Sequence, residues 1–474
     1  MVVVGAGLSG LTAAYRLRQA GVPVLVIDAN DKVGGRCRTL RGKFPNGQVA
    51  ELGGELIDTT HARMRALVEE LALPLDDLAD ADAGLTPEIY CIGRDKYSEA
   101  DIADAFRAMS ARYQADAQPL RDTSITYKTP GTAEALDRLS MADWLDQSGA
   151  PLWFQAILAA AFTAEYGLDI GDQSSLNLLT RLARRTEATP GLGLGDQRYR
   201  VHGGTSALID ALASAAERVD TGTALEGIRE RADGQIELDV KRGSATTVSA
   251  PQVIVTVPFS VLRGVKIGSE LPPSKRKAID QLGYGTSVKV VSGFDERVWR
   301  TKYKSTGSVV CDEWHSVWDA SRGQSGKTGI LAGILGGREG ATVSGMAAGE
   351  LSQHLVSHLE PLFHGIADTR EAGYDASFDW VGSEWSKGSH STYRPGQWTT
   401  LRGAEGERVK NLHFAGEHCS LTAQGTMEGA VASGEAAANE VLGDMGITPP
   451  APTSKAQNAH TGKRGGLFPW MRRG

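Results

Sequence analysis

The chain has 474 residues, of which 41% are hydrophobic and 23% are charged, and its formal net charge is −7. These proportions are typical of a globular protein with a large core and room for two domains. The acidic balance argues against nucleic acid as the main partner, and no apolar stretch is long enough to form a transmembrane helix.

The four cysteines, Cys37, Cys91, Cys311 and Cys419, form no CxxC pair and no metal-ligand spacing, so the sequence predicts no metal site. This cysteine usage favours a reduced, cytoplasmic protein and leaves a disulfide open. No secretory leader is visible, and because the chain starts directly on a strand-like run, export of a longer native form also stays open. The sequence is compatible with a homodimer.

The N-terminal residues give the clearest local pattern. An apolar run, Val2 to Val4, leads into Gly5-Ala6-Gly7-Leu8-Ser9-Gly10 and then into helical spacing. Gly5 permits a tight turn, Gly7 lets a pyrophosphate approach the backbone, and Gly10 lets helix and strand pack closely. A second strand over 24–27 ends at Asp28. This residue lies about 20 positions after the glycine motif, where a ribose-binding acid is expected. The combination predicts a dinucleotide site, with a purely structural glycine turn as the alternative.

The remaining elements follow in chain order. Residues 76–197 show mainly helical spacing. Later segments predict strands at 199–201, 236–240, 253–257, 287–291, 330–335 and 412–415, and helices at 208–216, 346–359 and 425–442.

These patterns predict an α/β protein with two domains. A Rossmann-like nucleotide-binding domain is assembled from the discontinuous segments 1–75, 198–284 and 402–446. An inserted α+β substrate-binding domain of mixed sheet and helices comprises 76–197 and 285–401. The Pro-rich tail, 447–474, has five basic and no acidic residues and is predicted to be flexible. The alternative for this tail is a docking arm or membrane contact through Leu467, Phe468, Pro469 and Trp470.

Three ordered motifs carry a family resemblance. Asp28 to Arg36, together with the glycines at 5–10, resembles the FAD-dependent amine oxidase superfamily of monoamine, polyamine and L-amino-acid oxidases. Glu51-Leu52-Gly53-Gly54-Glu55 resembles that family's flavin-contacting turn. Phe414 to His418 and Gly425 to Ala430 resemble its closing FAD motif.

The resemblance implies a bound FAD. Arg36 is expected to bring a cation to the diphosphate, with a surface salt bridge as the alternative. Glu417 is expected to accept ribitol or ribose hydroxyls or to cap the helix that follows. The charge of Asp28 disfavours NADP. The expected cofactor-binding residues are Gly5, Gly7, Leu8, Ser9, Gly10, Asp28, Ala29, Gly34, Gly35, Arg36, Leu52, Gly53, Gly54, Glu55, Leu225, Trp380, Gly416, Glu417, Gly425, Thr426, Met427 and Ala430.

The implied reaction is oxidation of a C–N bond, with hydride transfer to flavin N5, hydrolysis of the imine, and reduction of O2 to H2O2. Lys289, which resembles the family lysine that holds a water near N5, and His390 are the expected catalytic residues; the alternative for Lys289 is an outward-facing lysine on an edge strand. For His390, a role as a polar residue of the pocket is as plausible as a role as a catalytic base. The expected substrate pocket comprises Leu56, Trp385, His390, Tyr393 and Thr426.

The monoamine oxidase pattern is incomplete. Ser389 stands at the position of the flavin-linking cysteine, and His390 and Thr426 stand at the positions of the two cage tyrosines, so the FAD is expected to be non-covalent. An L-amino-acid substrate stays open and would need an arginine for its carboxylate. The candidates are Arg63, Arg65, Arg181, Arg185, Arg200 and Arg394. Two further alternatives are a flavin desaturase or dehydrogenase that does not act on amines, and a non-catalytic flavoprotein.

Overall fold

The computed structural model describes residues 1–121, 124–183, 192 and 194–450. The predicted basic tail from position 451 onward and the candidate Arg185 lie outside these residues. No helix within the described ranges is both long enough and apolar enough to cross a bilayer.

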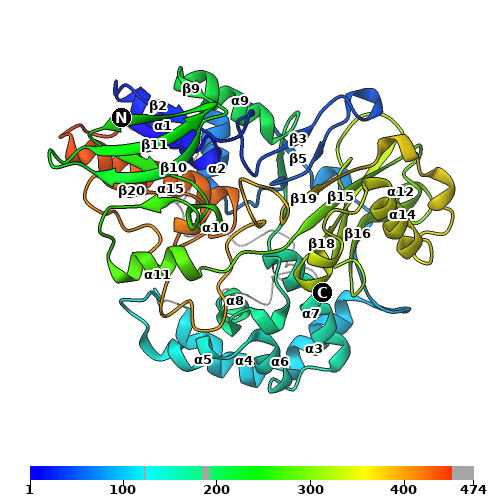
Figure 1. Cartoon of the computed structure of the whole chain (residues 1–474). Coiled ribbons are helices and arrows are strands. Elements are labelled where there is room, and N and C mark those ends of the chain that lie inside the picture. The colour runs from blue at the N-terminus through cyan, green and yellow to red at the C-terminus, as the bar shows by residue number, and fades with distance from the viewer. Residues whose placement is uncertain (122–123, 184–191, 193, 451–474) are drawn as a thin grey trace, which may run out of the picture.

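The first layer is a parallel five-stranded sheet (Figure 1). Its order is β20 (Leu412–Phe414), β13 (Val253–Val255), β1 (Val2–Val4), β2 (Leu25–Ile27) and β9 (Val219–Asp220). The strand at the centre is therefore the first in the chain, and its neighbours come from segments far apart in the sequence. This arrangement confirms the Rossmann-like sheet that the sequence predicted.

Successive side chains of these short strands point to opposite faces of the sheet, so they pack into two separate hydrophobic clusters. Val3, Val26 and Ile254 pack against helices on one face, whereas Val2 and Val4 pack toward the other. The helices on the first face are α1 (Leu8–Gln19), α2 (Ala62–Glu70), α9 (Thr205–Ala216) and α15 (Met427–Asp444).

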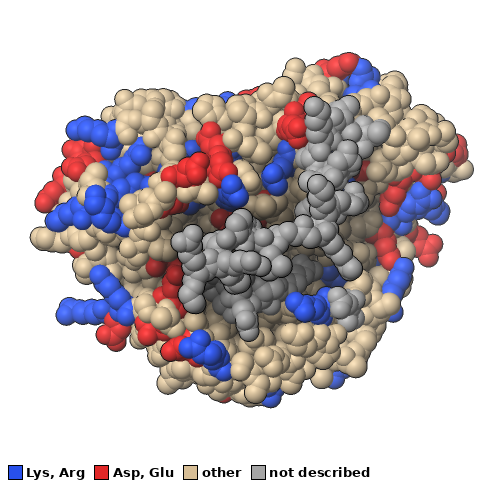
Figure 2. Space-filling model, turned by 180° about the vertical axis from the view of Figure 1, so that it is seen from behind, with Lys and Arg blue, Asp and Glu red and all other residues tan. Residues whose placement is uncertain are grey.

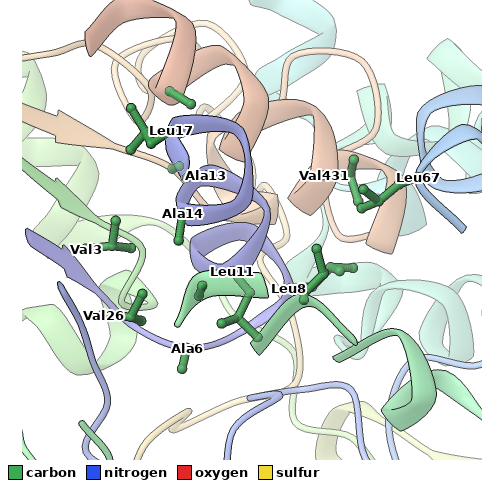
Figure 3. Packing of buried hydrophobic residues seen from close by; sticks show 14 of the residues in the cluster. Val3, Ala6, Leu8, Leu11, Ala13, Ala14, Leu17, Val26, Leu67 and Val431 are labelled. Atoms are coloured by element: carbon green, nitrogen blue, oxygen red, sulfur yellow. The ribbon is translucent and has the colours of Figure 1, made fainter. Parts of the chain in front are cut away.

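Small side chains let α1 lie close to its neighbours. Figure 3 shows Ala13, Ala14 and Leu17 of α1 between the strands that carry Val3 and Val26 and the C-terminal helix α15. The first and last helices of the described fold thus pack directly on each other.

A second, four-stranded layer covers the opposite face of the parallel sheet; its strands pair in antiparallel fashion except β10 and β14, which are parallel. Residues Ile228, Leu238 and Val240 pack onto Val2 and Val4 from this layer. Its strands are β12 (Ser244–Ala250), β11 (Ile236–Arg242), β10 (Ala224–Glu230) and β14 (Lys266–Ile267), and the nearby helices are α10 (Phe259–Leu262) and α11 (Pro273–Gln281).

The other half of the molecule is built on a mixed seven-stranded sheet (Figure 1). Its order is β19 (Ala376–Asp379), β15 (Val288–Phe294), β18 (Gly329–Leu335), β17 (Ser316–Asp319), β16 (Ser305–Cys311), β6 (Thr86–Ile92) and β7 (Asp95–Tyr97). The helices α12 (Val298–Thr301), α13 (Gly337–Thr342) and α14 (Ala348–Leu359) belong to the same part of the chain.

A group of helices forms the lower part of Figure 1 and has its own hydrophobic cluster. These helices are α3 (Glu99–Ala108), α4 (Ser110–Ala117), α5 (Glu134–Arg138), α6 (Met141–Asp146), α7 (Leu152–Tyr166) and α8 (Ser175–Leu182). The prediction of helices over 76–197 is therefore largely correct, but it missed the strand pair formed by β6 and β7. The turn at Gly93 (φ +57°) lets the two strands pair, and β6 then joins β16.

Two further sheets in the described residues have two short strands each. They are β3 (Thr39–Leu40) with β4 (Ala50–Glu51) and β5 (Leu75–Asp77) with β8 (Tyr199–Val201). Over the face seen in Figure 2, acidic and basic side chains are intermingled, as on an ordinary solvated surface.

Candidate active site

A cavity of about 930 Å³ runs along the ends of the parallel strands and toward the seven-stranded sheet. Ligands of open α/β sheets bind beyond the carboxyl ends of the strands, and this is where β1 and β2 end. Cavities of this size hold cofactors or drug-sized molecules.

The turn between β1 and α1 leaves space beside the backbone. Gly7, which lines the cavity, has an ordinary φ of −76°, and a side chain there would meet nothing within 4 Å. No side chain caps the N-terminus of α1, and its first turn has no acidic residue. A helix N-terminus that opens on empty space suits a phosphate group.

The two other glycines of the turn act through packing. Gly5 has a φ of +109°, which an L side chain rarely adopts. A Cβ at Gly10 would overlap the carbonyl oxygen of Gly5. Gly10 is absent from the cavity lining, which corrects its prediction as a cofactor-binding residue. Its contribution is the close approach of helix and strand, as the sequence also predicted.

Asp28 lines the cavity at the end of β2. Its carboxylate accepts backbone N–H groups of Ala6 (2.6 Å) and Asn30 (2.8 Å). Burial raises the pKa of Asp28 above its usual value, against the lowering effect of these hydrogen bonds. The acid thus fixes the glycine turn while its remaining lone pairs stay available to hydroxyl groups.

Arg36 and Glu417 form a buried ion pair that joins motifs 381 positions apart. The Arg36 Nη1 lies 2.6 Å from the Glu417 carboxylate and also donates to the carbonyl of Ser389 (3.0 Å). Glu417 further accepts from the Ser391 hydroxyl and the Gly425 N–H. Burial would raise the pKa of Glu417, but Arg36 and the other neighbours lower it to about 2.

These contacts revise the alternatives for both residues. The side chains of Arg36 and Glu417 pair with each other and both line the cavity, so this is not a salt bridge of the outer surface. Their expected roles toward a cofactor stay predictions. The N-cap of α15 is Thr426, whose side chain accepts from Gly429, rather than Glu417.

Lys289 lies in the cavity wall, only 4% exposed. Its ammonium lies 2.8 Å from the carboxylate of Glu55 and 4.7 Å from the ring centroid of Trp318. The indole N–H of Trp318 donates to the same carboxylate at 3.2 Å. Because β15 lies between β19 and β18, the edge-strand alternative for Lys289 is wrong.

His390 is held in one orientation. Its Nε2 lies 2.7 Å from the carbonyl oxygen of Glu165, and its Nδ1 lies 3.2 Å from the Ser389 hydroxyl. A carbonyl can only accept, so Nε2 carries a proton in the neutral ring. Proton uptake by His390 would therefore have to occur at Nδ1.

The tryptophans of the 380–385 segment both line the cavity. Trp380 donates to the carbonyl of Leu52 at 3.1 Å and packs on Phe378, with ring centroids 4.3 Å apart. This contact brings the Gly53 turn beside β19, so the second motif and the aromatic segment form one continuous wall.

Most predicted site residues come together in this cavity. Those that line it are Gly5, Gly7, Leu8, Ser9, Asp28, Ala29, Gly34, Gly35, Arg36, Leu52, Gly53, Gly54, Glu55, Leu56, Leu225, Lys289, Trp380, Trp385, His390, Gly416, Glu417, Gly425, Thr426, Met427 and Ala430.

Tyr393 corrects the prediction for the substrate pocket. It is 2% exposed and absent from the cavity lining, and its hydroxyl donates to Glu405 at 3.1 Å. Burial raises the pKa of Tyr393 well above its usual value. Its ring packs on Trp398, with centroids 5.1 Å apart, so the residue belongs to the core behind the site.

Among the predicted carboxylate-binding arginines in the described residues, Arg181 alone lines the cavity. Its guanidinium binds Glu165 (2.5 Å), the Tyr166 hydroxyl (3.3 Å) and the Leu194 carbonyl (2.9 Å). The others bind elsewhere: Arg63 to Glu435, Arg65 to the Thr59 carbonyl, Arg200 to the Ala320 carbonyl, and Arg394 to Asp172.

Several lining residues were not predicted. Trp318, Tyr166 and Trp398 add aromatic surface, and Arg38 and Arg402 add positive charge. Each sits in an ordinary helix, strand or loop pattern, so no sequence signal distinguishes it. Cys37 also lines the cavity, and burial raises the pKa of its thiol to about 12.

The cavity lies beyond the ends of the parallel strands and reaches the seven-stranded sheet, an arrangement that suits a nucleotide cofactor next to a second ligand. The family model for flavin-containing amine oxidoreductases matches residues 8–442, and the chain belongs to this family. It is an enzyme of the flavin amine oxidase type.

The relatives agree in class and differ in named activity. An L-amino acid dehydrogenase of Synechocystis sp. is 26% identical, with 93% of this chain and 94% of the relative covered. A flavin-containing amine oxidase of Oncorhynchus mykiss is 24% identical, with 95% of this chain and 87% of the relative covered. Cyclohexylamine oxidase from Brevibacterium oxydans has a TM-score of 0.81 at 21% identity, covering 94% of this chain and 99% of that one, which shows the shared fold.

Proposed function

We propose that the protein binds FAD non-covalently and oxidises the C–N bond of a small amine, with O2 as electron acceptor and H2O2 as product. The observation that carries this proposal is the continuity of the cavity from the Gly7 turn to the wall formed by Lys289 and Trp380. We further propose that segments 1–75, 198–284 and 402–446 hold the cofactor and that 76–197 and 285–401 hold the substrate.

The residues present fit the cofactor. The open space at Gly7 and the uncapped N-terminus of α1 suit a diphosphate, and Asp28 suits ribose hydroxyls. At the position of the family's linking cysteine, Ser389 bonds with the Ser287 hydroxyl at 3.0 Å. Denaturation with acid should therefore release all of the yellow cofactor into the supernatant, whereas a covalent link would leave it with the precipitate.

When bound, FAD supplies the hydride acceptor of the reaction. The chain's own residues exclude water, orient the substrate and hold protons. Trp318, Trp380 and Trp385 provide apolar walls, which disfavour the ammonium form of an amine and so favour the neutral form that can release hydride.

Lys289 is proposed to hold a water molecule in the reaction chamber. Two of its N–H groups face Glu55 and the Gly53 carbonyl (3.4 Å), which leaves a third donor. Glu55 compensates the buried charge, so the ammonium is kept in place without a further anion.

His390 is proposed to shape the pocket and, through Nδ1, to accept a proton. Its partner Glu165 also binds Arg181. This link supports a second candidate function, oxidation of an L-amino acid, because a substrate carboxylate could share the fork of Arg181. In that case Arg181→Lys should abolish amino-acid turnover and spare simple amines.

A substrate panel tests the proposal. Primary amines, secondary amines and L-amino acids are assayed for peroxide and, in parallel, for reduction of an artificial electron acceptor. Peroxide from amines supports the proposal, and turnover with the dye alone indicates a dehydrogenase. Failure of every nitrogen compound to bleach the flavin anaerobically would defeat both amine and amino-acid oxidation.

A further inference from the structure

Three potential metal ligands meet at the far side of the seven-stranded sheet. Cys91 of β6 and Cys311 of β16 are direct partners in the parallel pairing of these strands, and His358 of α14 lies over them. One ligand atom from each residue lies within 4.8 Å of the other two. None of the three lines the cavity, so the cluster is separate from the proposed reaction.

The imidazole is already oriented for coordination. The Nδ1 of His358 lies 2.7 Å from the carboxylate of Glu313, and its Nε2 lies 3.2 Å from the sulfur of Cys311. An ionised carboxylate can only accept, so Nδ1 carries the proton of the neutral ring and Nε2 presents its lone pair to the thiols. In metal-binding histidines, the ring nitrogen that does not bind the metal commonly donates its N–H to a carboxylate, which fixes the orientation of the ring.

We propose that Cys91, Cys311 and His358 form a zinc site, with Glu313 as the positioning residue for His358. Two thiolates and one imidazole suit zinc, whereas Mg²⁺ and Ca²⁺ prefer oxygen ligands. Binding of Zn²⁺ replaces the two thiol protons, which are released to solvent, and forms two Zn–S bonds and one Zn–N bond without any redox change. Water takes the fourth tetrahedral position.

The ligands need little movement to reach this geometry. Zn–S bonds of about 2.3 Å and a Zn–N bond of about 2.0 Å place neighbouring ligand atoms about 3.3 to 3.8 Å apart around a tetrahedral ion. Both cysteines are buried, and the His358 side chain is 9% exposed beside the exposed Glu313, so the ion can enter from this side.

The ion would connect parts of the chain that are distant in sequence. It would fasten β6 to β16 and to α14, next to the unpredicted pair β6–β7. The effect is on the stability of this part of the fold, and zinc binding should raise the thermal unfolding temperature of the wild type.

The test uses the flavin-loaded protein, purified with a reductant and without a histidine tag. Metals are removed with a chelator, and Zn²⁺ is added and measured by elemental analysis after gel filtration. Co²⁺ serves as the spectroscopic probe, because its tetrahedral bands lie in the red, beyond flavin absorption. We expect about one ion per chain and, after addition of Co²⁺, the red d–d bands of a tetrahedral site.

Matched variants separate the site from general damage. Cys91→Ser and His358→Ala should lose the ion, whereas Cys419→Ser and His354→Ala, the latter exposed on the same helix, should keep it. Glu313→Gln, at an exposed position, should weaken zinc affinity by about 10- to 100-fold. Flavin absorbance and circular dichroism report whether each variant is folded.

Three results would overturn the proposal. The first is the absence of stoichiometric zinc in wild type at micromolar free metal. The second is unchanged zinc affinity in folded Cys91→Ser and His358→Ala variants. The third is a Cys91–Cys311 disulfide in peptide maps of the reduced preparation, since neighbouring strands can also carry such a bond.

Discussion

Replacement of Glu417 by glutamine tests the ion pair with Arg36 that joins the two ends of the chain in the cavity wall. The wild-type carboxylate lies 2.6 Å from Arg36 and is 5% exposed as a residue. The amide keeps the size of the side chain but removes its charge, so the guanidinium of Arg36 remains in the wall with no carboxylate at this position. Loss of one partner of a buried pair is strongly destabilising.

The pKa gives the size of the effect. Burial opposes ionisation of Glu417, yet Arg36 and its other neighbours lower the pKa from 4.5 to about 2 in the folded protein. At about 1.4 kcal/mol per pKa unit, this corresponds to about 3 kcal/mol of folding stability at neutral pH. Because the folded pKa is depressed, the contribution is complete above about pH 4.5 and is lost as the pH falls toward 2.

Urea unfolding of the cofactor-free protein measures this contribution without interference from flavin affinity. The difference in unfolding free energy between wild type and Glu417→Gln should be about 3 kcal/mol at pH 7 and should shrink as the pH is lowered from 4.5 to 3. Asp77→Asn is the control, because Asp77 pairs with Arg198 at the surface and the change should cost little.

A difference between wild type and Glu417→Gln that stays constant from pH 7 to pH 3 would refute the reasoning. So would a cost at pH 7 no larger than that of Asp77→Asn. Either result would mean that the ion pair is not the source of the depressed pKa.

Three further changes address the site. Gly7→Val should leave the cofactor-free fold intact but abolish flavin binding, whereas Gly10→Val should unfold the protein because its side chain overlaps Gly5. Flavin absorbance and circular dichroism distinguish the two variants. A folded Gly7→Val protein that still binds flavin would contradict the proposed phosphate site at this turn. Lys289→Met, combined with Glu55→Gln to avoid an unpaired buried charge, should retain flavin and slow its reoxidation by oxygen in stopped-flow experiments; an unchanged rate removes the proposed role. His390→Ala should shift the pH profile of kcat/KM if Nδ1 accepts a proton, and should alter only KM if the residue shapes the pocket.

Local features of the sequence were sufficient to predict the glycine turn and the strands that lead into the cavity. The glycine spacing at 5–10 predicts a strand, a turn and a helix. Glycine has no side chain, so these positions permit the tight turn and the close contact between helix and strand. Likewise, β15 was predicted because its apolar run is the pattern of a buried strand, and Lys289 stood out as the charge within it.

Long-range pairing decided the rest. The partners of Arg36, Lys289 and Cys91 lie far along the chain, and spacing carries no information about which strands meet or in which register. Tyr393 shows the same limit, since its apolar ring and hydroxyl suit either a pocket or a core, and only packing against Trp398 and Glu405 assigned it to the core.

The sequence by itself therefore determined the glycine turn, the parallel sheet and the family, because these depend on interactions within a few residues and on repeated apolar patterns. The tertiary structure alone decided which charges compensate each other and which ligands converge, because burial makes an unpaired charge costly and forces distant segments to supply its partner.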